Sequence, residues 1–140
     1  MPYVSTFDRT QMMMCSWDSL VDPESIARII DAFVNSLDLA KYGVKEVATE
    51  GRPSYNPKGM YKLYIYGSRK EIRSSRKLAE SCKVNLEVKW LMGGAEPDFR
   101  TISDFRKDNI ESMKGIFHEF NRRLSMTCLL YTSDAADDLT

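Results

Sequence analysis

The sequence predicts an all-α fold, a small multi-helix domain, on three observations. Apolar side chains recur at intervals of three and four residues in several segments, and most of these segments follow a residue that can cap a helix N-terminus. No segment alternates convincingly as a strand does. The 140 residues, 43% hydrophobic and 29% charged, suffice for one domain with its own core, without metals or disulfides.

The first two helices carry the same start signal, a capping side chain followed by proline. Asp22 and Pro23 open a helix predicted to run to about Leu37, and Asn56 and Pro57 open one predicted to run to about Lys70. The segment from Val44 to Asn56 between them is typical of a loop, with a short extended piece around Lys45 to Val47. In the second helix we expect the tyrosines to lie in or near the core and Gly67 to let a neighbouring helix come close.

Four further helices follow. Ser74 or Ser75 is expected to cap the third, which includes Leu78, Ala79 and Cys82, and a fourth follows Asn85 and stops at Gly93 and Gly94. A fifth short helix begins at Asp98 or Thr101. The last runs from about Asn109 to Leu124, and its apolar stripe packs either into the core or against a partner. The members of that stripe are Ile110, Met113, Ile116, Phe117, Phe120 and Leu124.

The two ends of the chain lie outside the predicted domain, residues 21–127. Residues 1–20 form an N-terminal arm, whose Met12, Met13, Met14 and Trp17 side chains are expected to dock on the fold; a Met-rich partner-binding surface is the alternative. Residues 128–138, eleven in a row, back-translate into the mosaic-end adaptor of tagmentation sequencing libraries. We therefore expect residues 128–140 to be adaptor-derived and disordered, with the natural sequence ending near Thr127.

Charge is unevenly distributed along this formally neutral chain. Met1 to Gly51 carries four basic and eight acidic residues, whereas Arg52 to Lys83 carries nine basic residues against Glu71 and Glu80. Such a basic block is typical of a surface that faces phosphates, although a charged helix pair can also be merely solvated.

Two helical patterns meet within the basic block around a polar break, as in a helix-turn-helix. One helix would brace the DNA backbone, and the first turn of the next would read the major groove or bind phosphate through its N-terminus. The candidate DNA contacts of this pair are Lys62, Arg69, Lys70, Arg73, Ser74, Ser75, Arg76 and Lys77. A second candidate segment, Pro97 to Arg106, offers Arg100 and Arg106, with Lys107 beside them.

Other functional classes find little support. Three cysteines without paired spacing indicate a reducing compartment, and His118 stands without a second His or a Cys nearby, so we expect no metal site. No signal peptide or membrane-spanning run is found, so a cytoplasmic protein without a membrane partner is expected. Asp98 is expected to be a helix cap rather than a catalytic acid.

Five segments resemble, in consistent order, the N-terminal domain of bacterial insertion-sequence transposases of the DDE class. They are residues 29–39, 51–57, 72–78, 85–94 and 97–106, the last containing the motif Pro-Asp-Phe-Arg-Thr-Ile. The resemblance implies a helical domain that recognises the terminal inverted repeats of the element, on double-stranded DNA. It also implies a downstream RNase H-like domain whose three acidic residues bind two divalent metal ions, Mg²⁺, and cut and join DNA.

The chain stops before such a catalytic domain could begin. We therefore expect no enzymatic activity and no cofactor in this chain. Two alternatives stay open: a stand-alone helix-turn-helix regulator, and a helical module that forms a homodimer through the stripe on its last helix.

Overall fold

The computed structural model describes residues 3–43 and 55–139, of which 127–139 are described by their backbone alone. Within these ranges all regular structure is helical and no strand occurs, which confirms the all-α prediction. The expected extended piece at Lys45 to Val47 lies outside the described residues. The elements are η1 (Asp18–Leu20), α1 (Ile26–Ser36), η2 (Leu39–Tyr42), α2 (Pro57–Arg69), α3 (Ser75–Val84), α4 (Leu86–Met92), α5 (Phe99–Asp108) and α6 (Ile110–Leu139).

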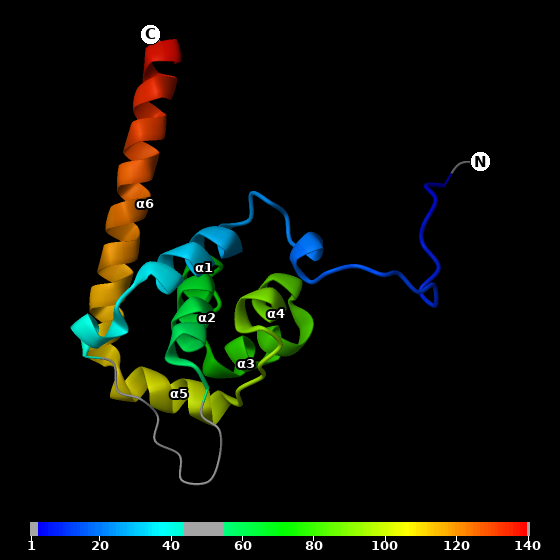
Figure 1. The fold of residues 1–140 in the computed structure, drawn as a ribbon, viewed down its shortest axis with the longest axis horizontal. Coiled ribbons are helices and arrows are strands. Elements are labelled where there is room, and N and C mark those ends of the chain that lie inside the picture. Colours follow the sequence, from blue (N-terminus) through cyan, green and yellow to red (C-terminus); the bar gives the residue numbers. More distant parts are fainter. Residues whose placement is uncertain (1–2, 44–54, 140) are drawn as a thin grey trace.

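Helix α2 is the centre of the domain (Figure 1), in contact with α1, α3 and α4. A helix that is apolar on nearly all sides is expected to be buried on all sides. Residues 63–67 form such a run, because every residue in it is buried. Three of the tyrosines, Tyr61, Tyr64 and Tyr66, lie in the core as expected, whereas Tyr55, which precedes α2, is 37% exposed.

Local capping signals set most helix starts. Asn56, Ser74, Asn85 and Asp98 each accept a hydrogen bond from a backbone N–H of the helix that follows. The cap at Asn56 is as predicted, and Ser74 and Asp98 are each one of the two residues that the sequence offered. The first helix is the exception, since the predicted start at Pro23 is wrong and α1 begins at Ile26. Asp22 instead accepts from the N–H of Glu24 at 2.8 Å in a turn, and Ser25 supplies the cap.

Helix α6 is longer than predicted. It continues past Leu124 to Leu139, so the backbone of residues 128–139 is helical where the sequence suggested a disordered tail. No proline or glycine follows Gly115, and nothing local therefore ends the helix. The adaptor origin of these residues stays a prediction.

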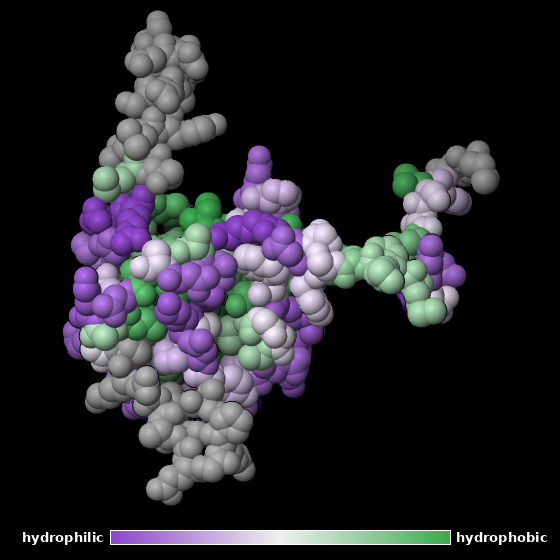
Figure 2. All heavy atoms as spheres, in the orientation of Figure 1, coloured by the Kyte–Doolittle hydropathy of each residue, from purple (hydrophilic) through white to green (hydrophobic). Residues whose placement is uncertain are grey.

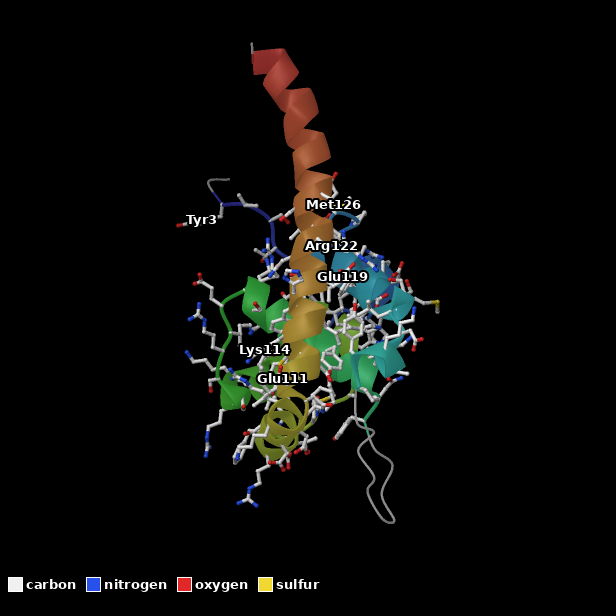
Figure 3. The ribbon with its side chains drawn as sticks, turned by 90° about the vertical axis from the view of Figure 1, so that its left-hand side faces the viewer. Tyr3, Glu111, Lys114, Glu119, Arg122 and Met126 are labelled. Carbon is white, nitrogen blue, oxygen red and sulfur yellow. The ribbon has the colours of Figure 1, made fainter. Side chains whose placement is uncertain are left out.

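The apolar stripe of α6 packs mainly inside the domain. Met113, Ile116 and Phe120 are buried, and the Phe120 ring meets Phe33 of α1 edge-on, with centroids 5.1 Å apart. Of the two interpretations of this stripe, the core is therefore the one that the packing favours. Along the exposed side of α6, Figure 3 shows Glu111, Lys114, Glu119 and Arg122 in succession.

The N-terminal arm does not dock as expected. Met12 and Met14 are almost fully exposed and Trp17 is 59% exposed, and the arm extends away from the body (Figures 1 and 2). An aperiodic segment cannot present one continuous apolar face, which explains why these side chains do not pack on the body of the domain. The chain is held from Asp18 onward, where Arg28 of α1 binds the carboxylate at 2.9 Å and the Asp18 and Val21 carbonyl oxygens at 2.6 and 2.9 Å.

Candidate nucleic-acid interface

The turn between α2 and α3 is closed by backbone hydrogen bonds. Lys70 caps α2, and Glu71 then adopts the left-handed conformation with φ 61°. The Ile72 N–H donates to the Gly67 carbonyl oxygen at 2.7 Å, the bond that defines a Schellman closure. The basic side chains of this turn therefore project from an ordered backbone.

Gly67 permits the close packing of this turn, as the sequence predicted. A Cβ at this position would lie 2.7 Å from the Ile72 carbonyl oxygen and 2.7 Å from Cδ2 of the buried Leu78. Real Cβ atoms essentially never come that close to other heavy atoms. Gly67 thus allows both the turn and α3 to approach α2.

The first turn of α3 is fixed by Ser74. Its hydroxyl oxygen accepts from the Lys77 N–H at 3.4 Å, and its carbonyl oxygen accepts from the Leu78 N–H at 2.9 Å. Ser74, rather than Ser75, is therefore the cap. Ser75 is half-buried beside Tyr64, where its hydroxyl partly opposes the effect of burial, which raises the pKa of Tyr64 to about 12.

Arg76 joins α3 to α5. Its guanidinium carbon lies 4.2 Å from the centroid of the Phe99 ring, which belongs to the first residue of α5. A guanidinium stacked on an aromatic face is attracted by the ring, while the N–H groups in its plane can still donate. Sequence reasoning missed the supporting role of Phe99, because nothing local in the sequence links residue 76 to residue 99.

Arg73 and Arg106 are also brought together. Both line one hollow between the α2–α3 turn, α5 and α6. The two candidate segments, one around residue 73 and one around residue 100, thus adjoin in space. We call their exposed cations the basic surface, which comprises Arg69, Lys70, Arg73, Arg76, Lys77, Arg100, Arg106 and Lys107.

The helices that carry these residues are coloured green and yellow in Figure 3, where several nitrogen-ended side chains project outward. Arg69 and Lys70 lie at the end of α2, with the Lys70 ammonium 6.0 Å from the Tyr66 ring centroid. Arg100 lies in the first turn of α5. There its charge contributes, after the Thr101 hydrogen bonds, to lowering the pKa of Asp98.

Lys62 is the one candidate that the structure places elsewhere. Its ammonium forms an ion pair with Asp31 of α1 at 2.7 Å, and its side chain is only 11% exposed. The sequence places Lys62 on the same helix as Arg69 but does not show that α1 packs over it. Lys62 therefore lies outside the basic surface.

Acidic side chains limit the basic surface on its other flank. A second hollow, between α3 and the start of α5, is lined by Glu80, Glu96 and Asp98 as well as by Arg76 and Lys83. Positive charge is thus concentrated around the first turn of α3, where the partial positive charge of a helix N-terminus adds to it.

The described ranges contain neither a metal-ligand cluster nor a membrane-spanning helix. In them no three His, Cys, Asp or Glu side chains are grouped as metal ligands would be. The same ranges contain no helix with the length and apolar character needed to cross a membrane. Asp98 is a cap, as predicted, and accepts from the Thr101 N–H at 2.8 Å.

Comparison with known protein families gives a match. A family model described as "Transposase domain (DUF772)" matches residues 15–108, which include α1 to α5 and the whole basic surface. No curated protein matches, and no solved structure matches.

Proposed function

Because the chain belongs to the transposase domain family DUF772, we propose that it binds double-stranded DNA in transposition, at the terminal inverted repeats of an insertion sequence. The first turn of α3 would lie on the DNA, with the end of α2 and α5 on either side of it. Arg73 and Arg76 would contact base edges or phosphates, and Lys70 and Arg100 would contact phosphates only.

One observation carries this proposal: cations from two separate segments of the sequence adjoin around the first turn of α3. Arg76 lies over Phe99, and Arg73 shares a hollow with Arg106. If the charges served only to keep the surface solvated, cations from separate segments would not have to lie next to one another. A duplex backbone, which carries one negative charge per about 1.7 Å of helix axis, is the ligand that a basic surface of this extent fits.

Three further points concern catalysis, cellular location and assembly. DNA cleavage and its divalent metal are assigned to a catalytic domain outside this sequence, so this chain alone would bind DNA without cutting it. The protein would act in the cytoplasm, where the element's DNA is accessible. Because the α6 stripe is mainly buried, a homodimer, if formed, would use another surface.

Binding isotherms at several salt concentrations test the proposal. We expect Arg73→Ala with Arg76→Ala to weaken binding to an inverted-repeat duplex and to lower the salt slope. Loss of a base-reading arginine costs about 1–3 kcal/mol and relaxes the preference over a scrambled duplex. Lys70→Ala should weaken binding to both duplexes alike.

Arg122→Ala is the matched control. It removes an exposed arginine that binds Glu119 on α6 and belongs to none of the candidate contacts. If the Arg73 and Arg76 double variant binds both duplexes as tightly as the Arg122 control and with the same salt slope, the proposed interface is wrong. Mg²⁺-dependent cleavage by the purified chain would contradict the separation of binding from catalysis.

A further inference from the structure

The hollow shared by Arg73 and Arg106 has a volume of about 290 Å³ and lies beside the α2–α3 turn. Its walls come from four parts of the fold: α2, the α2–α3 turn with α3, α5 and α6. The apolar part of the lining is Ile72, Leu78, Met113 and Phe117. Among the described residues, the two arginines are the only charged members of the lining.

The charges in this hollow are uncompensated within the described part of the chain. No acidic side chain lines it, and the ion pairs found in residues 3–43 and 55–126 include neither Arg73 nor Arg106. Two like charges beside an apolar wall repel each other more strongly than in bulk water. An anion between them would relieve that repulsion.

The remaining polar groups of the lining carry no negative charge that could offset the two arginines. Tyr64 is neutral, since burial raises its pKa to about 12, and its hydroxyl is already bonded to the Ile102 carbonyl oxygen. Ser68 is exposed and contributes only a neutral hydroxyl. The hollow on the other flank of α3, by contrast, is lined by three carboxylates as well as by Arg76 and Lys83, so its cations already have acidic side chains beside them.

We propose that this hollow binds a single DNA backbone phosphate between the guanidinium groups of Arg73 and Arg106. The inference rests on the proposed function and deepens it. Guanidinium groups donate paired N–H bonds to phosphate oxygens, so two of them can satisfy one phosphate from two sides. Because Arg73 belongs to the turn before α3 and Arg106 to α5, this phosphate fixes the position of the first turn of α3 along the backbone.

Sharing one phosphate has a measurable consequence for the salt dependence of binding. A plot of log affinity against log salt has a negative slope, and the magnitude of this slope decreases by about one for each phosphate that the protein no longer neutralises. If Arg73 and Arg106 hold the same phosphate, Arg73→Ala with Arg106→Ala lowers the slope by about one, not by about two. Each single variant binds roughly tenfold more weakly, and the double variant loses less than the product of the two single losses.

The experiment uses the whole chain and a duplex of random sequence of about 20 base pairs, since a phosphate contact needs no particular bases. Lys70→Ala with Arg106→Ala is the matched control pair. Lys70 does not line the hollow, so the slope and affinity losses of this pair should add. Circular dichroism checks that each variant keeps its helices.

The outcomes separate this inference from the proposed function. If the wild-type chain binds DNA but the Arg73 and Arg106 losses simply add, or neither substitution has an effect, the shared phosphate is wrong while DNA binding stands. If the wild-type chain binds no DNA, both fail. In that case, Tm is compared in inorganic phosphate and in chloride at equal ionic strength. If phosphate raises the Tm of the wild type but not that of the double variant, the hollow is a site for a free anion.

Discussion

Gly67→Ala should destabilise the domain, although alanine is the better helix former. In an open helix position the change from glycine to alanine stabilises by roughly 0.5–1 kcal/mol. At Gly67 the added methyl would meet the Ile72 carbonyl oxygen and Leu78 Cδ2, each at 2.7 Å. Forcing an extra methyl into a packed site costs about 1–3 kcal/mol. The net result is a loss of up to about 2.5 kcal/mol in the free energy of unfolding.

Gly59→Ala is the matched control on the same helix. There the new Cβ would lie 3.8 Å from Met92 Sδ and 3.9 Å from its Cε, which is ordinary contact. This variant should therefore gain the helix-propensity term without the strain. The difference between the two variants isolates the strain at Gly67, about 1–3 kcal/mol.

Urea unfolding followed by circular dichroism measures both variants under the same conditions. The two midpoints are compared at equal m-values, so that a change in stability is not confused with a change in the denatured state. If Gly67→Ala is as stable as Gly59→Ala, α3 and the turn can move away from α2 at little cost. The account of Gly67 as the residue that seats α3 would then be refuted.

Two more predictions concern single polar groups in α2 and the turn after it. Tyr66→Phe removes a hydroxyl that donates to the Glu87 carboxylate at 3.1 Å and should lower the free energy of unfolding by about 1–3 kcal/mol. Tyr61→Phe should leave it nearly unchanged, because the buried Tyr61 hydroxyl has no hydrogen-bond partner and the Ser112 hydroxyl donates to the Tyr42 carbonyl oxygen instead. Equal losses in urea unfolding would contradict this distinction. Glu71→Gly should raise the free energy of unfolding by about 0.5–1 kcal/mol. The left-handed conformation costs a non-glycine residue about 1–2 kcal/mol, and the larger conformational entropy that glycine loses on folding offsets roughly half of this gain. Glu71→Gln is the charge control: it should bind DNA more tightly without gaining stability, and equal stabilisation by both variants would assign the effect to charge rather than to the backbone.

The sequence predicted what depends on neighbours in the chain. The caps Asn56, Ser74, Asn85 and Asp98 act on N–H groups two or three residues away, so the residue types and spacing suffice. The start of α1 was missed although its signal is also local. Two capping residues, Asp22 and Ser25, compete there, and the structure uses Ser25, whose hydroxyl also donates to the Glu87 carboxylate of α4, a contact that the sequence does not show.

Long-range packing accounts for the parts of the site that the sequence could not supply. In the sequence Lys62 lies among other cations of α2. Only the packing of α1 on α2 shows that its ammonium forms an ion pair with Asp31. The two candidate segments were separate alternatives in the sequence. They adjoin because α3 packs on α5, which puts Arg76 over Phe99.

The same packing changes what the charge of the basic block means. Of its nine cations, Lys62 is paired with Asp31, Lys58 donates to the Asn35 carbonyl oxygen, and Lys83 lies in the last turn of α3, away from its first turn. A count along the sequence therefore overstates the cations that this block can offer to one duplex. The block keeps those near the first turn of α3, and α5 adds cations that the block does not contain. Salt dependence should accordingly respond to substitutions in α5 as well as in the α2–α3 turn, and hardly at all to substitutions of Lys58 or Lys83.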